Sequence, residues 1–382
     1  RIGGLSLNNN NNNADELIDD GRDALEDINE LLGEQVKSVL NEENKKSKNR
    51  MNIKKRYPIL AIAIIILLIL IPIGKRVMIH TAGNYIYNKL EIDSSTYNND
   101  NSIEQNKDVS LANTNDNNYI VKNILLLGVE EFYGASNTDS IIIASLNTNE
   151  KTLKLTSLMR DLYVEIPGHD NNKLNAVYSK GGISLLYETI EKNFGIKMDG
   201  YILVNFESFE NIVNNLNGIE ITLTKNEANY LNTKNYISDP KNRNVVEGTQ
   251  IMNGNQVLGY CRVRYVSTGT ENNDFGRTQR HRIVLNSIFN KVKKLNIFQL
   301  TSFMNNVLSD SNITTDISQK DFNNYLEQLL DILGEIKIYE YRVPSDGTYE
   351  DKKVLIGSKK RDVLVPKDWN STRKDIKDFI ED

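Results

Sequence analysis

The sequence has little of the residues that covalent cross-links and zinc sites require. Its 382 residues include one cysteine and three histidines. The single cysteine, Cys261, excludes an intramolecular disulfide framework, and so few cysteines and histidines argue against a zinc site of the usual Cys/His type. Any metal ion is therefore expected to be a hard cation held by carboxylates and phosphate.

The chain also lacks an excess of positive charge. It contains 46 Lys and Arg against 51 Asp and Glu, which gives a formal net charge of -5. Proteins whose main partner is nucleic acid normally offer a broad basic surface. Nucleic acid is therefore not expected as a principal partner. The length allows one large domain or two ordinary ones.

One apolar run departs from the soluble character of the rest. Residues 58–73 are uninterruptedly apolar, and the span 57–74 has about the length needed to cross a bilayer. Lysine and arginine are dense over residues 45–56, whereas only Lys75 and Arg76 follow closely. The positive-inside rule then places the N-terminus in the cytoplasm. A cleaved signal peptide is the competing interpretation, but its apolar region would be unusually long and no clear cleavage site follows, which favours an uncleaved anchor.

These patterns divide the chain into segments of different character. Residues 93–118 are rich in Asn, Asp, Ser and Thr and have no periodicity, as expected of a flexible spacer. Residues 17–39 fit either an amphipathic helix or an acidic appendage. The expected segments are a cytoplasmic N-terminal segment (1–56), a transmembrane anchor (57–74), an extracytoplasmic stalk (75–118) and one folded domain (119–382).

Strand and helix patterns are intermixed from Tyr119 onward. The predicted strands are 124–127, 140–146, 153–159, 201–205, 219–223 and 362–365. The predicted helices are 183–194, 206–217, 253–262, 277–295 and 372–380. We therefore predict an α/β domain, with a central mixed sheet covered by helices on both faces.

The densest group of chemistry-bearing side chains lies over residues 259–282. This stretch has only two acids, Glu271 and Asp274, and its arginines are Arg262, Arg264, Arg277, Arg280 and Arg282. Guanidinium groups stay protonated, and their planar forks match phosphate oxygens. Helical spacing places Arg277 and His281 on one face. The stretch fits either a pocket for a di- or polyphosphate or a solvated basic face.

Three further polar residues lie at the ends of predicted strands, where α/β proteins tend to place their chemistry. Glu130 follows the first strand, Asp139 precedes the second and Arg160 follows the third. A loop over 131–138 could bring Glu130 and Asp139 together around a Mg²⁺ that is shared with a substrate phosphate. Each carboxylate could instead be solvated or cap a turn, and Arg160 with Asp161 could be a surface pair.

The order of motifs over residues 119–295 resembles the LytR-CpsA-Psr family. The motifs that carry the resemblance are 123–128, 137–140, 157–161, 173–178, 181–182, 213–221, 254–264 and 274–280. The resemblance implies an enzyme anchored in a Gram-positive membrane. Such an enzyme attaches polyprenyl-pyrophosphate-linked glycopolymers (teichoic acid, capsule or secondary wall polymer) to peptidoglycan on the outer face, with Mg²⁺.

The resemblance also implies roles for single residues. The arginines that hold the pyrophosphate correspond to Arg160, Arg262, Arg264 and Arg277, and the metal-associated acids correspond to Glu130 and Asp139. Asp274 and Arg160 are the expected catalytic residues, and Asp274 is the candidate that deprotonates the acceptor hydroxyl. The alternative role of Asp274 is the N-cap of the following helix. Lys173 and His281 complete the expected substrate-binding set.

Three residues depart from the family's pattern. Glu130 replaces an aspartate and would shift a bound Mg²⁺. Asn137 replaces an arginine, which removes a positive charge. His281 replaces a glutamine, which keeps a donor and adds pH sensitivity. Cys261 stands where the family has a small or apolar residue, so we predict a core position for it.

Three functions fit the sequence. The first is the transferase, whose lipid substrate should enter a long apolar pocket between the sheet and the helices. The second is a hydrolase of the same lipid pyrophosphates, with water as the acceptor. The third is a non-catalytic lipid-binding or regulatory protein. A transcriptional role is disfavoured because residues 1–50 show no helix-turn-helix pattern.

Overall fold

The computed structural model describes residues 79–94, 121–132, 135–309 and 312–381. The chain divides into two units, 1–73 and 74–382, and every described residue belongs to the second. The expected anchor lies outside the described residues. Of the expected stalk, residues 79–94 are described, and they form a helix and a strand, β1 (Glu91–Ile92), that belongs to the central sheet. Within the described ranges, no helix has the length and apolar character needed to cross a membrane.

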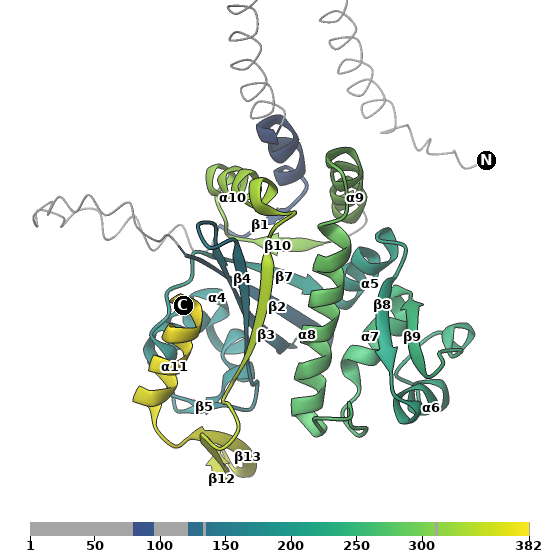
Figure 1. The fold of residues 1–382 in the computed structure, drawn as a ribbon. Coiled ribbons are helices and arrows are strands. Elements are labelled where there is room, and N and C mark those ends of the chain that lie inside the picture. The colour runs from purple at the N-terminus through teal and green to yellow at the C-terminus, as the bar shows by residue number, and fades with distance from the viewer. Residues whose placement is uncertain (1–78, 95–120, 133–134, 310–311, 382) are drawn as a thin grey trace, which may run out of the picture. The chain divides into compact units, whose positions relative to one another are not determined.

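A seven-stranded mixed sheet forms the centre of this unit (Figure 1). Its strands, in spatial order, are β1 (Glu91–Ile92), β10 (Ile313–Thr315), β7 (Gly200–Asn205), β2 (Lys122–Phe132), β3 (Ala135–Asn147), β4 (Thr152–Leu158) and β11 (Lys337–Val343). β2, β3 and β4 pair antiparallel, whereas β7 runs parallel to β2 and β11 runs parallel to β4. The predicted mixed sheet is confirmed.

Helices cover both faces of the sheet because both faces of its central strands are apolar. Leu125 and Ile143 are buried among the residues of α4 (Tyr178–Phe194) and α11 (Trp369–Glu381). Their neighbours Leu126 and Ile142 point to the other face, where α8 (Asn273–Val292) and α10 (Gln319–Ile332) pack. This alternation with a period of two residues produces the predicted α/β fold with helices on both faces.

A second core lies beside the sheet. β8 (Ile219–Leu223) and β9 (Gly248–Met252) form a separate antiparallel pair that packs with α6 (Lys225–Thr233) and α7 (Gly254–Arg262). Side chains of β8 alternate between buried and exposed. α5 (Phe206–Asn215) packs on α7 and also contacts β7 and α9 (Ile297–Ser309). Through its contacts with β7 and α7, it links the sheet to this second core.

Local signals explain several helix boundaries. α4 ends at Gly195, whose positive φ of 73° suits glycine. α7 begins with a capping box in which Asn253 and Gln256 bond reciprocally. α8 begins at Asn273 with Asn272 as its N-cap residue, four residues before the predicted start. The alternative role of Asp274 as N-cap is therefore wrong, because this residue lies within the first turn.

The predicted loop over 131–138 is also wrong. β2 continues to Phe132 and β3 begins at Ala135, so the two strands form one long hairpin with a bulge between Gly128 and Val129. The backbone of Glu130 lies opposite that of Asn137. The polar composition of this stretch suggested a loop, but backbone pairing extends the strands through it. The side chains of residues 130–137 lie outside the described part of the chain.

Candidate active site

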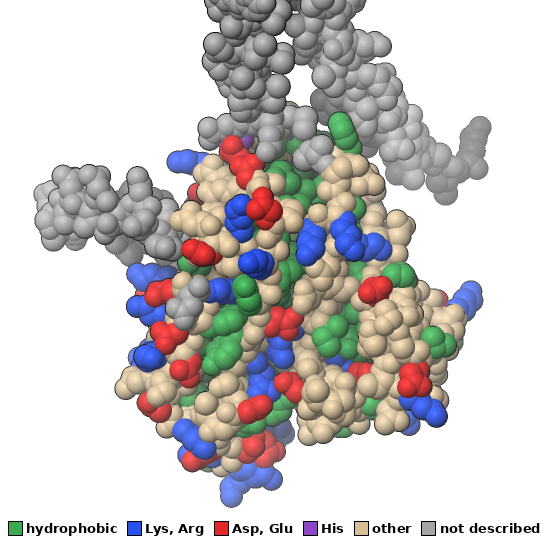
Figure 2. Space-filling model, viewed as in Figure 1, with side chains coloured by type: hydrophobic (Ala, Val, Ile, Leu, Met, Phe, Trp, Pro, Cys, Tyr) green, Lys and Arg blue, Asp and Glu red, His purple; other side chains and the backbone are tan. Residues whose placement is uncertain are grey.

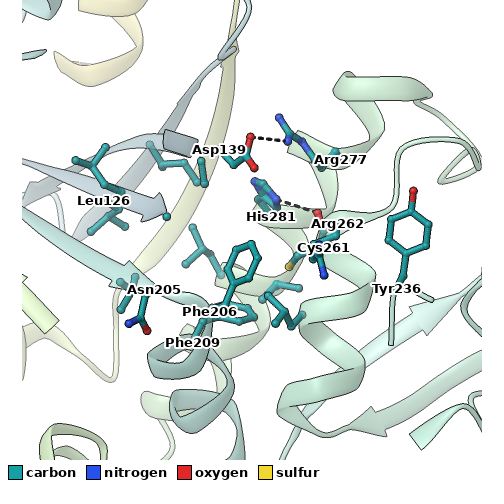
Figure 3. Close-up of a pocket in the computed structure, with 18 of the residues that line it drawn as sticks. Leu126, Asp139, Asn205, Phe206, Phe209, Tyr236, Cys261, Arg262, Arg277 and His281 are labelled. Atoms are coloured by element: carbon teal, nitrogen blue, oxygen red, sulfur yellow. Dashed lines mark hydrogen bonds and ion pairs between the residues drawn. The ribbon is translucent and has the colours of Figure 1, made fainter. Parts of the chain in front are cut away.

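An apolar pocket of about 320 Å³ lies between the sheet and helices α5, α7 and α8 (Figure 3). Strands β2, β3 and β7 supply one wall, and the helices supply the other. The apolar lining includes Leu126, Ile142, Val204, Phe206, Phe209, Leu258, Val284 and Leu285. The structure thus contains the apolar pocket between sheet and helices that the sequence led us to expect.

Charged side chains line one part of this pocket and converge on Asp139 of β3. Arg160 and Arg277 donate to Asp139 Oδ1 over 2.5 and 3.2 Å, and Arg264 Nη2 lies 3.9 Å from the same oxygen. The three arginines come from the segment after β4, from the segment after α7 and from α8. Residues far apart in the sequence therefore form one cluster.

Asp274 is the second carboxylate of the cluster. Its Oδ1 lies 2.8 Å from Arg277 Nη2, 3.4 Å from Arg160 Nε and 3.8 Å from Arg264 Nε. Three guanidinium groups thus face two carboxylates, which leaves the cluster with one excess positive charge. We call these five residues the arginine cluster: Asp139, Arg160, Arg264, Asp274 and Arg277.

The arginine cluster is suited to an oxyanion. Burial alone would raise the pKa of Asp139, but Arg277, Arg160 and Arg264 together lower it below its ordinary value, so this carboxylate stays ionised. Arg160 Nε and Arg277 Nε are buried and make no hydrogen bond within the described residues. Buried donors of this kind are costly unless a partner satisfies them, and phosphate oxygens would do so.

Arg262 lies in the pocket wall apart from the arginine cluster. Its guanidinium stands 5.2 Å from the ring centroid of Phe206, in a cation–π arrangement. Of the four predicted phosphate-binding arginines, Arg262, Arg264 and Arg277 line the pocket. Arg160 joins Arg264 and Arg277 at the same two carboxylates.

His281 also lines the pocket, but it does not titrate near neutral pH. Its Nε2 lies 3.0 Å from the carbonyl oxygen of Cys261, which can only accept, so Nε2 carries the proton. Burial, with a further contribution from Arg277, lowers the pKa of His281 to about 3. The imidazole is therefore neutral near pH 7, and pH sensitivity at this position is expected only at acid pH. Cys261 belongs to the second core, as predicted, and burial raises the pKa of its thiol to about 12.

Lys173 lies outside the pocket. Its Nζ donates to Asp161 Oδ1 over 2.7 Å, and Asp161 Oδ2 lies 3.8 Å from Arg160 Nε. In this structure Lys173 reaches the arginine cluster only through Asp161.

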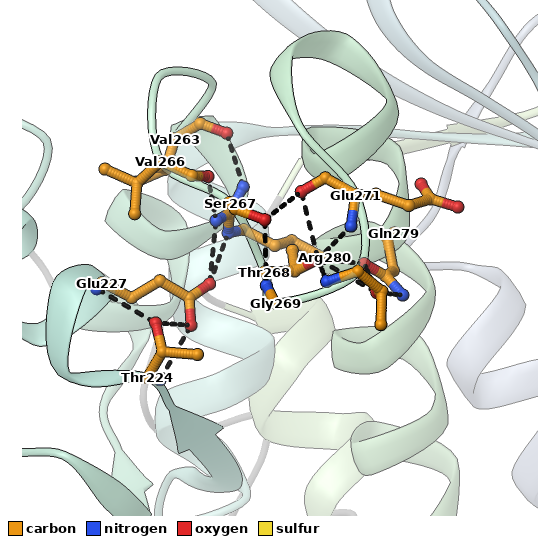
Figure 4. A network of polar contacts seen from close by, with 11 residues as sticks. Thr224, Glu227, Val263, Val266, Ser267, Thr268, Gly269, Glu271, Gln279 and Arg280 are labelled. Atoms are coloured by element: carbon orange, nitrogen blue, oxygen red, sulfur yellow. Dashed lines mark hydrogen bonds and ion pairs between the residues drawn. The ribbon is translucent and has the colours of Figure 1, made fainter.

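Two arginines of the 259–282 stretch, Arg280 and Arg282, do not line the pocket and are held in ion pairs elsewhere. Arg280 is fully buried, and its Nε and Nη2 donate to Glu227 Oε1 over 3.0 and 2.8 Å (Figure 4). Arg282 pairs instead with Glu340 at 3.3 Å. No local pattern indicates the first pair, because Glu227 lies 53 residues before Arg280.

The buried pair positions the loop that carries Arg264. Arg280 also donates to the carbonyl oxygens of Val263 and Val266, which lie on either side of Arg264 (Figure 4). Glu227 is fixed in turn through its second oxygen, which accepts from the backbone and hydroxyl groups of Thr224. Arg280 thus acts on the site through the backbone and not by contact with a ligand.

Comparison of the sequence with known protein families identifies the family of this chain. The sequence model of the LytR_cpsA_psr family matches residues 85–366. The chain belongs to the LytR-CpsA-Psr family. The match reaches well beyond residues 119–295, over which the motifs showed the resemblance.

Relatives within the LytR-CpsA-Psr family carry two kinds of name. Regulatory protein MsrR of Staphylococcus aureus is 30% identical over 270 residues, which cover 68% of this chain and 74% of MsrR. The polyisoprenyl-teichoic acid–peptidoglycan teichoic acid transferase TagU of Enterococcus faecalis is 32% identical over 233 residues, 59% of this chain and 71% of TagU. The crystal structure of B. subtilis TagT shares the fold, with a TM-score of 0.52 at 24% identity over 71% of this chain and 95% of TagT.

The described residues of this family member offer only a partial metal site. No group of three His, Cys, Asp or Glu side chains that could hold a metal ion occurs among them. Asp139 is the one predicted ligand whose side chain is described. Mg²⁺ is commonly bound by one or two carboxylates together with substrate phosphates and water. The donor set therefore fits Mg²⁺ only when a phosphate is present.

Proposed function

We propose that this chain is a membrane-anchored, extracytoplasmic phosphotransferase that joins a polyprenyl-pyrophosphate-linked glycopolymer to peptidoglycan. One observation supports the proposal most: an apolar pocket is bordered by Arg262, Arg264 and Arg277. This juxtaposition matches a ligand with a hydrocarbon tail and a diphosphate head. The transferase name of TagU and the apolar span 57–74, as the anchor, agree with it.

In the proposed complex, the polyprenyl chain lies along the apolar lining and the pyrophosphate lies at the arginines. Guanidinium forks bind phosphate oxygens in a bidentate manner. The pyrophosphate would satisfy the buried donors Arg160 Nε and Arg277 Nε. Arg262, which stacks on Phe206, adds a further positive charge to the pocket wall.

The proposed reaction moves one phosphoryl group. A peptidoglycan hydroxyl oxygen attacks the glycan-proximal phosphorus, the bond from that phosphorus to the bridging oxygen breaks, and polyprenyl phosphate leaves with that oxygen. The arginines stabilise the charge that develops on the leaving phosphate. When Mg²⁺ is bound, it neutralises phosphate charge, and Asp139 and Glu130 are the residues proposed to hold it.

Asp274 is the proposed acceptor of the hydroxyl proton. Without substrate, its carboxylate is shared by Arg160, Arg264 and Arg277. A bound pyrophosphate competes for these same guanidinium groups. The competition leaves Asp274 with fewer guanidinium partners, so its oxygens become available to accept the proton of the acceptor hydroxyl.

The test uses the purified full-length chain in detergent, a synthetic polyprenyl-pyrophosphate sugar and peptidoglycan oligomers, with and without Mg²⁺. The proposal predicts Mg²⁺-dependent release of polyprenyl monophosphate, with sugar phosphate joined to the oligomer. Release without coupling would identify a hydrolase. Binding without release would identify a lipid-binding regulator, in keeping with the name of MsrR.

A further inference from the structure

A basic hairpin projects from the domain after the central sheet is complete. β12 (Tyr349–Ile356) and β13 (Lys359–Pro366) pair antiparallel around a two-residue turn. Residues 352–361 contain no acid in a chain whose formal net charge is -5. Figure 2 shows blue side chains gathered where Figure 1 places this hairpin. Its exposed cations are Lys352, Lys353, Lys359, Lys360 and Arg361.

Folding does not account for these cations. The side chains of Lys359, Lys360 and Arg361 make no hydrogen bond or ion pair within the described residues. Lys352 pairs with Glu350 and Lys353 with Asp362, and all four side chains are about half or more exposed. Such surface pairs add little to stability. The cations are therefore available to a ligand.

The strand register places three of the cations on one face. Lys352 lies opposite Val363, Arg361 opposite Val354, and Lys359 opposite Ile356. Residues that lie opposite each other on the two strands point to the same face of the hairpin, and every second pair along the strands points to that face again. Each residue adds roughly 3.3 Å along a strand. Lys352, Arg361 and Lys359 therefore form a row about 13 Å long, with apolar side chains between them. A row suits a chain of repeated anions better than it suits a single small anion.

The base of the hairpin is attached to the proposed active site. Leu364 N donates to the carbonyl oxygen of Asp161 over 3.0 Å, one residue after Arg160. The ring of Tyr349 lies 5.6 Å from that of Phe275, one residue after Asp274. These contacts fix the direction of the hairpin relative to the arginine cluster.

We propose that this hairpin binds the anionic polymer of the donor, the run of phosphodiester groups beyond the pyrophosphate-linked sugar. The proposal rests on the proposed function and extends it to the part of the substrate outside the pocket. A strand of this length spans about 26 Å, so the row meets phosphates several repeats away from the reacting one. Such contacts weaken as salt rises.

Anionic lipid is the competing ligand for these cations, and the topology favours the polymer. The segment 79–94 follows the proposed anchor and supplies β1, at one edge of the sheet. The hairpin follows β11, at the opposite edge. Because the proposed anchor precedes the β1 edge in the chain, we expect the hairpin at the opposite edge to meet the polymer and not lipid.

The experiment uses the full-length chain and a triple variant, Lys352→Ser with Lys359→Ser and Arg361→Ser. The matched control, Lys192→Ser with Lys197→Ser and Lys377→Ser, removes the same charge from exposed positions elsewhere. Binding of fluorescent, lipid-free poly(glycerol phosphate) is measured at low and high salt, with dextran as the uncharged probe. We expect roughly tenfold weaker polymer binding for the hairpin variant at low salt, no change for the control and no binding of dextran.

Turnover then links the hairpin to the donor. A donor with one sugar and no phosphodiester chain should be used equally well by both variants, whereas a polymer-bearing donor should show a KM raised roughly tenfold for the hairpin variant alone. Equal polymer binding by the two variants would overturn the proposal. Binding to phosphatidylglycerol vesicles is measured as well. A hairpin variant that loses affinity for these vesicles but keeps its affinity for the polymer would also overturn the proposal. If the wild type releases no polyprenyl phosphate from either donor, the proposed function fails. The polymer-binding measurement would still test whether the hairpin binds an anionic polymer.

Discussion

Arg277 and Arg280 lie one turn apart on α8, and both are almost completely buried. Arg277 pairs with Asp139 and Asp274, the two carboxylates of the arginine cluster, and keeps one donor without a hydrogen bond. Arg280 uses its Nε and both terminal nitrogens on Glu227 and on two carbonyl oxygens. Burial alone therefore does not separate a ligand-binding arginine from a structural one. The partners separate the two: Arg277 keeps an unused donor beside the pocket, where the proposed phosphate would bind, whereas Arg280 is fully engaged within the protein.

The largest effect on stability is expected at the buried ion pair between Glu227 and Arg280. Glu227→Ala leaves the charge of Arg280 buried without its partner, so the free energy of unfolding should fall by about 3–5 kcal/mol. Urea denaturation measures this value. Replacing both partners with apolar residues, Glu227→Leu with Arg280→Met, should restore much of the loss. A loss below about 1 kcal/mol for Glu227→Ala would show that the pair is not closed to water.

Substitution of Arg277 should have the opposite consequences, with a large effect on turnover and a small effect on stability. Arg277→Gln removes a donor to the developing phosphate charge, and turnover should fall by about 10²–10³-fold. Stability should change little, because Asp139 and Asp274 keep Arg160 and Arg264 as partners. Arg282→Gln on the same helix is the control, since it breaks a pair with Glu340 without touching the pocket. A similar fall in turnover for both variants would contradict the distinction.

A smaller effect is expected from His281, and it depends on pH. Its pKa of about 3 in the folded state lies below the unfolded value of about 6.5. The unfolded chain therefore binds more protons between these values, and stability falls as the pH is lowered through this window. At pH 4.5 the contribution reaches at most about 2.7 kcal/mol. Between pH 7 and 4.5, the wild type should lose more thermal stability than His281→Gln does. Equal losses would place the imidazole in contact with water.

The smallest effect is expected at Lys173, which the sequence assigned to substrate binding. Its partly exposed pair with Asp161 should contribute only about 0.2–1 kcal/mol. Lys173→Ala should therefore reduce turnover less than tenfold, because the lysine reaches the arginine cluster only through Asp161. A loss as large as that of Arg277→Gln would restore Lys173 as a direct ligand. Steady-state kinetics with a single-sugar donor decides between these results.

Features that depend on local sequence were predictable. The stop at Gly195, the cap at Asn253 and the alternation along β2 and β3 each follow from a few neighbouring residues. The arginines of the site were found because guanidinium chemistry and the family's motif order pointed to the same positions.

Features that depend on distant pairing were not predictable. Nothing near Arg280 in the sequence indicates Glu227, so the sequence left open whether Arg280 belongs to a phosphate pocket or to a solvated basic face. Strands β2 and β3 continue beyond Gly128 through polar residues, and only their pairing shows that residues 130–132 and 135–138 are strand. The basic hairpin likewise gains its row of cations from register and not from composition.

The most direct test of the central claim is the affinity for a polyprenyl pyrophosphate of a double variant, Arg262→Ala with Arg264→Ala. Binding is measured by titration calorimetry alongside the release of polyprenyl phosphate from a single-sugar donor. If these arginines hold the pyrophosphate, affinity should fall at least about 100-fold, since each charged hydrogen bond contributes about 1.5–3 kcal/mol, and release should cease while the thermal unfolding temperature stays near that of the wild type. Wild-type affinity and release in this variant would contradict the claim.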